Sequence, residues 1–380
     1  MKHIWRVSLV LAAALGVFIV SRTTAQQDLP FAVEPIAGFR EPWSMAFMPD
    51  GRILVTEKKG HLFIVSPSGE KSEPAVGVPE VDYGGQGGLG DVVLHPDFSA
   101  NRTIYLSYAE SGKGRRRGAA VAKAVLGGSA TQPELADLEV IWRQFPKVNG
   151  RGHYGHRMAF DDDGYLFISS GERQKFTPSQ DMKSSMGKII RLNDDGSVPA
   201  DNPFFDRPTS GDSVVHQQVW SLGHRNPLGM AFDGNGRLWE VEMGPAGGDE
   251  LNLIQRGANY GYPEVSNGNH YDGRPIPDHD TRPEFAKPAI WWTPVVSPGD
   301  LMIYGGDLFE PWRGNALVAG LSSNAIVRIR LEADGAKEVE RYAMGARIRS
   351  LEEGPDGAVW VLEDGSGPRG RLLKLTPTGR

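Results

Sequence analysis

The chain has no cysteine, which excludes disulfide bonds, thiolate metal sites and cysteine nucleophiles. It also lacks an excess of positive charge, because 41 Lys and Arg residues against 47 Asp and Glu residues give a net charge of −6. A protein with this balance has no large positive field for attracting nucleic acid, so we expect no nucleic-acid partner. The single basic run, residues 113–117, lies among glycines and is interpreted as a solvated loop tip.

Long hydrophobic runs are also missing, apart from residues 7–20. This apolar stretch follows the positively charged residues 1–6 and precedes the small residue Ala25, a pattern typical of a secretory signal peptide cleaved after Ala25. A membrane anchor is the alternative, but the stretch is shorter than the about 20 residues that a span needs. We therefore expect residues 1–25 to be removed, and the remaining chain to be periplasmic or secreted without a membrane span.

Glycine and proline are abundant, with 48 and 27 residues, and favour short strands and turns over long helices. One pattern recurs, in which an apolar strand, a tight turn and a second β-rich strand follow one another. Clear Asp-Gly or Asn-Gly turns lie at residues 50–51, 163–164, 235–236 and 356–357, and weaker copies lie at 92–106 and 305–318. Repeats of this kind are typical of propeller blades.

The sequence therefore predicts an all-β fold, a six-bladed β-propeller over residues 26–380, with separate small β-domains as the alternative. The segment 259–298 is rich in proline and aromatic residues, and we expect it to form a long functional loop insertion on one face. Residues 85–90 match the dinucleotide fingerprint GxGxxG, but a β pattern ended by Pro96 follows instead of a helix. We reject nucleotide binding there and expect the glycines to form a turn or to approach a ligand closely.

Three other motifs carry candidate functional side chains. His153 lies at a loop-to-strand junction and is a candidate general base, with a structural histidine as the alternative. His224, Arg225 and Asn226 precede another strand and present several donors that suit a carbonyl or an anion. Arg347 and Arg349 alternate on a predicted strand and would share a face, which suits a polycarboxylate ligand; a surface salt-bridge pair is the alternative.

Oxygen ligands for a hard cation are also present in the sequence. Glu242 ends a strand and is followed by Gly244 and Pro245, whose carbonyl oxygens could bind calcium, although a plain turn is the alternative. Asp249, Glu250 and the turn at residues 259–261 offer oxygens for a second site.

Read in order along the chain, these motifs resemble the soluble PQQ-dependent glucose/aldose sugar dehydrogenase family, where PQQ is pyrroloquinoline quinone. The resemblance covers nearly the whole chain after residue 25, and its motifs lie at residues 85–89, 153–167, 222–229, 244–252, 257–263 and 347–349. It implies a six-bladed propeller with PQQ over the central axis and long loops on the cofactor face. It also implies hydride transfer from C1 of an aldose to PQQ, with calcium assisting and a lactone as product.

The resemblance also implies roles for individual residues. His153 would be the catalytic base, and Arg225 would stabilise the negative charge that grows on the substrate oxygen. The residues implied to line PQQ are Gln86, His153, Arg225, Asn226, Tyr271, Ser322, Ser323, Asn324, Arg347, Ile348 and Arg349. The carbonyl groups of Gly244 and Pro245 would bind the catalytic calcium, and Glu250 with the Tyr260 carbonyl group resembles a second, structural calcium site.

The chain departs from the family at several positions. Gly152 stands where the glucose-specific branch has an acidic residue, and His156 replaces a residue that is usually small. Ser322, Ser323 and Asn324 stand where relatives often carry a lysine. These departures affect the affinity for PQQ and the choice of sugar.

Two other functions remain as alternatives. A calcium-dependent propeller lactonase would hold its metal in the central tunnel mainly by carboxylate and amide groups, without an arginine pair. A non-catalytic binding propeller would not need His153, Arg225 and Asn226 together. The electron acceptor stays open, with a quinone or a cytochrome as candidates; the basic run at residues 113–117 offers a docking place for an acidic electron-transfer partner.

Overall fold

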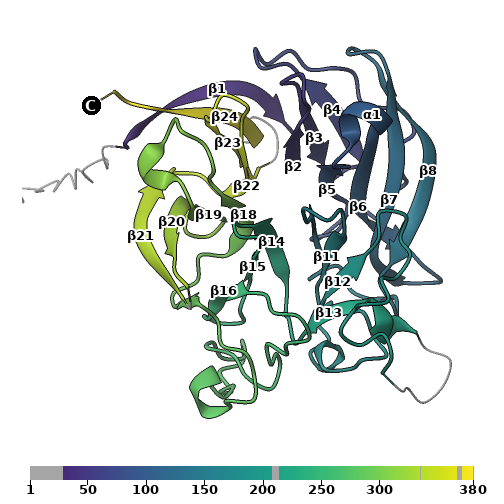
Figure 1. The fold of residues 1–380 in the computed structure, drawn as a ribbon, viewed down its shortest axis with the longest axis vertical. Helices are drawn as coiled ribbons and strands as arrows, with labels where there is room; N and C mark the ends of the chain where they lie inside the picture. Colours follow the sequence, from purple (N-terminus) through teal and green to yellow (C-terminus); the bar gives the residue numbers. More distant parts are fainter. Residues whose placement is uncertain (1–28, 208–213, 334, 366–369, 380) are drawn as a thin grey trace, which may run out of the picture.

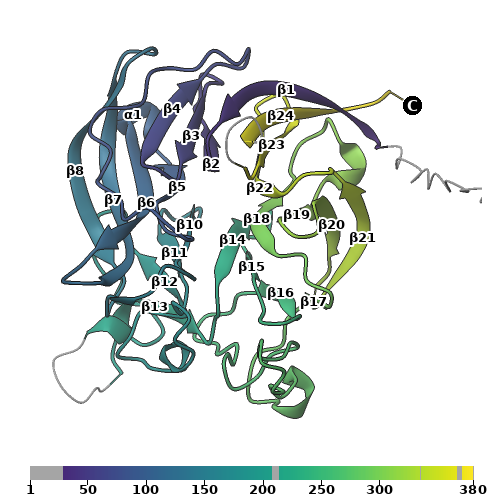
Figure 2. The ribbon, with the colours of Figure 1, turned by 180° about the vertical axis from the view of Figure 1, so that it is seen from behind.

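Six antiparallel sheets surround a common axis in the computed structural model, which describes residues 29–207, 214–333, 335–365 and 370–379 (Figure 1). Figure 2 shows the same ring from behind. The predicted all-β, six-bladed propeller is therefore confirmed. The expected signal peptide at residues 1–25 lies outside the described residues.

The first blade consists of β2 (Pro42–Phe47), β3 (Ile53–Glu57) and β4 (His61–Val65). The second consists of β5 (Leu89–Leu94), β6 (Thr103–Ser111), β7 (Arg116–Gly128) and β8 (Pro133–Arg143), with β9 (Val148–Asn149) beside β7. The third consists of β10 (Gly155–Phe160), β11 (Leu166–Ser170), β12 (Lys188–Leu192) and β13 (Val219–Leu222). The fourth blade consists of β14 (Pro227–Phe232), β15 (Leu238–Glu242), β16 (Asp249–Leu253) and β17 (Ile290–Trp292). The fifth consists of β18 (Pro298–Ile303), β19 (Asn315–Gly320), β20 (Ala325–Leu331) and β21 (Ala336–Ala343). The sixth consists of β22 (Ile348–Glu353), β23 (Val359–Glu363), β24 (Gly370–Pro377) and β1 (Phe31–Phe39).

In the residues that the structure describes, helical structure is confined to short turns. These are α1 (Phe98–Asn101) and the 3-10 turns η1 (Thr177–Ser179), η2 (Val215–Gln218), η3 (His279–Thr281) and η4 (Glu310–Trp312). Within the described ranges, no helix has the length and apolar character needed to cross a membrane.

The two ends of the chain close the ring by pairing with each other in the sixth blade. β1 is its outermost strand and runs antiparallel to β24, with Phe31 opposite Pro377 and Phe39 opposite Gly370. The first strand of the described chain thus completes the blade that the last three strands form. The backbone hydrogen bonds between β1 and β24 therefore close the ring of blades.

The tight turns that the sequence predicts are the hairpins between the first and second strands of the blades. Gly51 joins β2 to β3 with φ of 83°, and Gly236 joins β14 to β15 with φ of 72°. These angles favour glycine, which has no Cβ atom to clash with the backbone. The loop predicted at 259–298 is also present, but it contains β17, the outer strand of the fourth blade.

The hydrophobic core is distributed into six clusters, each between two neighbouring blades. β3 shows how one strand serves two of them. Ile53 and Val55 face the sixth blade, whereas Leu54 between them faces the second blade. Since successive side chains of a strand point to opposite faces, a blade strand is buried on both sides and reads as a continuous apolar run.

The innermost strands of all six blades meet at one side chain, Arg157 of β10. Its guanidinium group forms ion pairs with Asp91 of β5 (3.2 Å) and Asp300 of β18 (3.1 Å). It also donates hydrogen bonds to the Ser44 hydroxyl group of β2 (3.3 Å), and to the carbonyl oxygens of Leu228 in β14 (2.8 Å), Gly299 in β18 (2.9 Å) and Arg349 in β22 (3.4 Å). One cation therefore links every blade at the axis.

The acidic side chains Asp300 and Glu352 near this cation have raised pKa values. A cavity of about 410 Å³ on the axis is lined by Arg157, Asp91, Asp300 and Glu352 among others. Burial raises the pKa of Asp300 to about 6, although Arg157 opposes the shift. Burial and the charges of Asp300 and Asp91 raise the pKa of Glu352 to about 8.

These shifts predict how stability depends on pH. The folded protein holds the Glu352 proton more tightly than the unfolded chain does, so raising the pH from about 5 to about 8 costs folding free energy. The variant Glu352→Gln lacks this proton, and its free energy of unfolding should rise relative to the parent protein by about 1–2 kcal/mol over that range, allowing for partial solvent screening. Denaturant unfolding at several pH values measures the difference, and parallel pH profiles of the two proteins would contradict the prediction.

Candidate active site

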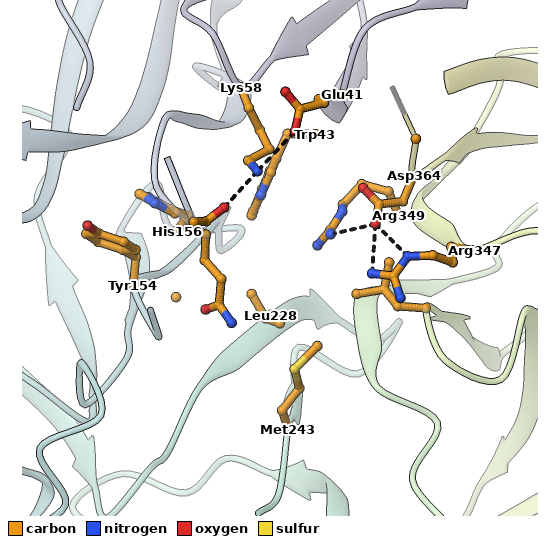
Figure 3. Close-up of a pocket in the computed structure, with 15 residues that line it drawn as sticks. Glu41, Trp43, Lys58, Tyr154, His156, Leu228, Met243, Arg347, Arg349 and Asp364 are labelled. Carbon is orange, nitrogen blue, oxygen red and sulfur yellow. Dashed lines mark hydrogen bonds and ion pairs between the residues drawn. The ribbon is translucent and has the colours of Figure 1, made fainter. Parts of the chain in front are cut away.

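Two neighbouring cavities lie where loops precede the innermost strands. The first, of about 440 Å³, is lined by Gln86, His156, Arg347 and Arg349 among others (Figure 3). The second, of about 270 Å³, is lined by residues that include His153, Arg225, Pro245 and Tyr271. The cavities adjoin at Gln86, whose Oε1 atom accepts a hydrogen bond from the backbone N–H group of His153 (2.6 Å).

The strand order explains why residues far apart in sequence meet here. His153 precedes β10, Arg225 and Asn226 precede β14, and Arg347 precedes β22. Each of these strands is the innermost one of its blade, and the innermost strands contact one another around the axis. Residues that directly precede them are therefore brought to one end of the axis.

His153 is held by a buried acid that no motif indicated. Its Nδ1 atom lies 2.5 Å from Oε1 of Glu172, at the end of β11, and both side chains are buried. Glu172 also accepts backbone hydrogen bonds from Gln174 (2.9 Å) and Phe176 (2.6 Å), so its position is fixed. With Nδ1–H directed at this carboxylate, the Nε2 atom of His153 carries the lone pair, and no described residue occupies it.

The electrostatic surroundings keep His153 neutral. Burial lowers the pKa of His153, and the charges of Arg225 and Arg173 act in the same direction, while Glu172 opposes them. Burial alone would raise the pKa of Glu172, but the hydrogen bond from His153 and the backbone N–H group of Phe176 keep it below its ordinary value. A neutral imidazole beside an ionised carboxylate is suited to accept a proton from a hydroxyl group.

Arg225 and Asn226 are anchored through their backbone by Glu242. The Oε2 atom of Glu242 accepts hydrogen bonds from the N–H groups of Arg225 (2.5 Å) and Asn226 (3.1 Å). The guanidinium group of Arg225 donates to the carbonyl oxygens of Met243 (2.8 Å) and Gly244 (2.6 Å) and to the Tyr271 hydroxyl group (3.3 Å). Nε of Arg225 and Nδ2 of Asn226 are buried without a hydrogen-bond partner among the described residues.

Arg347 and Arg349 point to the same side, as their alternation predicts, and a protein carboxylate lies between them. Oδ2 of Asp364 is 2.8 Å from Nη2 of Arg347 and 3.3 Å from Nη2 of Arg349 (Figure 3). Burial alone raises the pKa of Asp364, but the two arginines lower it below its ordinary value. The pair therefore binds a carboxylate group, although this one belongs to the protein.

His156 lines the first cavity, whereas His153 lines the second. Its ring stacks on Tyr154 with centroids 5.2 Å apart and meets the edge of Trp43 at 5.8 Å. Burial, reinforced by Arg173, Arg157 and Lys58, lowers the pKa of His156 to about 3. His156 is thus a neutral, tightly packed ring.

Several oxygen atoms nearby are suited to a cation. The carbonyl oxygen of Gly244 already accepts a charged donor, the guanidinium group of Arg225. A small cavity of about 10 Å³ is lined by residues that include Glu242, Gly244, Glu250 and Tyr260. Burial and the charge of Glu242 raise the pKa of Glu250 well above its ordinary value, so this acid lacks a matched positive charge.

His279 lies between the two groups of the expected second calcium site. Its Nε2 atom is 3.1 Å from the Tyr260 carbonyl oxygen, and its Nδ1 atom is 3.7 Å from Oε1 of Glu250. Beside this site, the ligand atoms of His224, Glu240 and Glu242 lie within 4.8 Å of one another and form a further group able to hold a metal.

Some residues implied by the resemblance lie outside the cavities. The side chain of Ile348 is fully buried in the core between the fifth and sixth blades, so its predicted place beside the cofactor is open only to its backbone. Ser322, Ser323 and Asn324 follow β19, where Leu321 lines the first cavity instead. The Ser322 hydroxyl group binds Ser297 (2.7 Å), and Ser323 Oγ is buried without a partner in the described part of the chain.

Comparison with known proteins agrees with this geometry. A family model described as "Glucose / Sorbosone dehydrogenase" matches residues 39–374. The aldose sugar dehydrogenase YliI of Escherichia coli is 37% identical, with 88% of this chain and 90% of the relative aligned.

Solved structures are similar as well. The apo form of the soluble aldose sugar dehydrogenase from Escherichia coli has a TM-score of 0.84 at 36% identity, covering 92% of this chain and all of that one (100%). The PQQ-bound aldose sugar dehydrogenase of Streptomyces coelicolor has a TM-score of 0.73 at 27% identity, covering 91% and 98%.

Two functional candidates, Glu172 and Asp364, are not indicated by any motif in the sequence. Each is a single charged residue in a loop or at a strand end, with no motif around it. Glu172 could have been found from one signal, since it follows the strand after His153 and an imidazole base needs an acid to orient it.

The contact between His153 and Glu172 predicts a measurable pKa change. The variant Glu172→Gln removes the group that raises the pKa of His153, so this pKa should fall further below its ordinary value. An NMR titration of the His153 ring signals measures it. The control variant Glu110→Gln, which alters a carboxylate paired with Arg143 and Lys147, should leave these signals alone. An unchanged His153 titration in Glu172→Gln would show that the acid does not tune the ring.

Proposed function

Because the chain belongs to the Glucose / Sorbosone dehydrogenase family, we propose that this oxidoreductase is a PQQ-dependent aldose sugar dehydrogenase that forms lactones with the help of calcium. The observation that carries the proposal is a buried histidine, held through Nδ1 and with no partner for Nε2 in the described part of the chain, beside a cavity that contains a pair of carboxylate-binding arginines. The substrate is an aldose, the electron acceptor is a quinone or a cytochrome, and the mature protein is periplasmic or secreted.

The residues present fit PQQ, which carries several carboxylate groups. Arg347 and Arg349 already hold the Asp364 carboxylate, so their geometry suits such a group. Nε of Arg349, Nε of Arg225 and Nδ2 of Asn226 are buried donors without partners in the described ranges. Unpaired buried donors are costly, and a polar ligand would relieve that cost.

Calcium fits the oxygen ligands beside Arg225. The carbonyl groups of Gly244 and Pro245 would hold one ion, and Glu250 with the Tyr260 carbonyl oxygen would hold another. A divalent cation would offset the buried negative charge that raises the pKa of Glu250. PQQ supplies the hydride acceptor when bound, and calcium at Gly244 would add positive charge beside it.

The protein's own part in the reaction follows from the contacts of His153 and Arg225. Nε2 of His153 accepts the proton of the sugar C1 hydroxyl group while C1 gives up a hydride, so the sugar loses two electrons and two protons, one proton to His153 and the other within the hydride. Glu172 keeps the Nδ1 proton in place and stabilises the imidazolium ion that forms. Arg225, in the wall of the same cavity, stabilises negative charge on the substrate oxygen.

The two alternative functions fit the structure less well. A tunnel calcium, as in a lactonase, would need free carboxylates on the axis, but Asp91 and Asp300 are ion-paired with Arg157. A binding propeller without catalysis has no need for the contact between His153 and Glu172. These observations favour the dehydrogenase.

Reconstitution tests the proposed function directly. Protein produced without PQQ should show no sugar oxidation, and should gain dye-linked aldose oxidation only when PQQ and calcium are both added. A screen of aldoses with an artificial electron acceptor measures this and identifies the sugar. Activity with NAD alone, or lactone hydrolysis that needs calcium but no PQQ, would refute the proposal.

Replacing His153 tests the assignment of the base. His153→Ala should still bind PQQ and calcium but reduce its cofactor about 10²–10⁴-fold more slowly, because the variant lacks the proposed base for the hydroxyl proton. His156→Ala is the matched control and should cost much less, since His156 faces the other cavity. Single-turnover reduction of bound PQQ by excess aldose measures both. A near-normal rate in His153→Ala would disprove the assignment and direct attention to His156 or His224.

A further inference from the structure

A third cationic side chain enters the larger cavity from a different blade. Lys58 directly follows β3 in the first blade, whereas Arg347 and Arg349 belong to the sixth. All three line the cavity of about 440 Å³, and Figure 3 shows the Lys58 ammonium group lying apart from the arginine pair. The cavity therefore presents positive charge at two separate places.

The Lys58 ammonium group is only partly satisfied by the protein. Its Nζ atom donates a hydrogen bond to the Gly85 carbonyl oxygen (2.9 Å) and lies 3.6 Å from Oε1 of Glu41, which is too far for a strong hydrogen bond. The Tyr83 ring is 5.9 Å away. Since an ammonium group has three donors, Lys58 keeps donor capacity for a ligand, while its side chain is only 15% exposed.

Glu41 holds Lys58 loosely because it is itself bound elsewhere. Its Oε2 atom accepts a short hydrogen bond from the Tyr83 hydroxyl group. Its backbone N–H group donates to the Gly365 carbonyl oxygen (2.8 Å), and its own carbonyl oxygen accepts from the Lys58 N–H group (3.0 Å). Glu41 thus stays in place whether or not Lys58 turns toward a ligand.

The two cationic places differ in how fully the protein neutralises them. Asp364 makes close contacts with both arginines, whereas the carboxylate group of Glu41 lies 3.6 Å from the ammonium group of Lys58. A ligand with one carboxylate needs only one of the two places. A ligand with carboxylates on separate edges can use both.

We infer that Lys58 binds a carboxylate group of the bound cofactor, at a position different from the one that Arg347 and Arg349 bind. This inference rests on the proposed function, because it takes PQQ, a tricarboxylate, as the ligand. Lys58 becomes a ligand-binding residue of this chain, and Glu41 is the counter-charge that holds it in the unliganded protein.

Binding of two ligands to apo-protein tests the inference without any sugar turnover. The ligands are PQQ and its trimethyl ester, which has the same rings but no carboxylate charge, and the signal is quenching of tryptophan fluorescence, since Trp43 lines the cavity. Lys58→Met should bind PQQ about tenfold more weakly than the parent protein and should bind the ester equally well. Lys58→Arg should keep most of the affinity for PQQ.

Glu41→Gln provides a change in the opposite direction. Removing its charge leaves Lys58 without a competing carboxylate, so PQQ should bind at least as tightly as to the parent protein. Thermal unfolding of each variant checks that the fold is retained. Equal PQQ affinity of Lys58→Met and the parent protein would overturn the inference, and so would an equal loss for PQQ and the ester, which would indicate a structural role. A parent protein that fails to bind PQQ with calcium present would instead refute the proposed function.

Discussion

The contacts of Arg157 at the axis are the constraint on which the rest of the molecule depends. Hydrogen bonds or ion pairs join this one guanidinium group to residues of five blades, and its own backbone belongs to the remaining one. Removing a cation from water costs several kcal/mol of free energy, and only partners at close distance offset this desolvation penalty. This requirement specifies the position of each innermost strand more tightly than non-directional contacts between apolar blades can.

The contacts of Arg157 also position the active site, because the innermost strands hold both the partners of Arg157 and the residues of the site. Arg157 lies four residues after His153 on the strand that His153 precedes, and the carbonyl oxygen of Arg349 accepts one of its hydrogen bonds. Leu228, another acceptor, lies two residues after Asn226. A change in the contacts of Arg157 would therefore shift His153, Arg349 and Asn226 together. The site is built on short connections from a rigid centre, although its residues are in loops.

The fold could be predicted from the sequence because the strand-turn-strand pattern repeats along the chain. Part of the site belongs to no repeated pattern and could not be predicted. Four hairpin turns lie at the predicted Asp-Gly and Asn-Gly dipeptides, whereas the second blade joins β5 to β6 through α1, without a glycine. The motif residues His153 and Arg225 line one cavity, as their positions before innermost strands allow. Glu172 and Asp364 meet their partners across 19 and 17 residues, through strand pairing that composition does not report. The side chain of Ile348 is turned by its strand position into the core between two blades, a burial that the motif alone does not indicate.

Each functional group of the site is held by a protein acid or carbonyl group that leaves part of its bonding capacity unused. Glu172 binds Nδ1 of His153 and leaves Nε2, while Asp364 binds Arg349 and leaves Nε. Met243 and Gly244 bind Arg225 through Nη1 and leave its Nε unpaired. Full satisfaction would make the unliganded protein more stable but would leave less for a ligand to gain. The arrangement fixes the side chains before a ligand arrives, so binding has little conformational freedom left to remove.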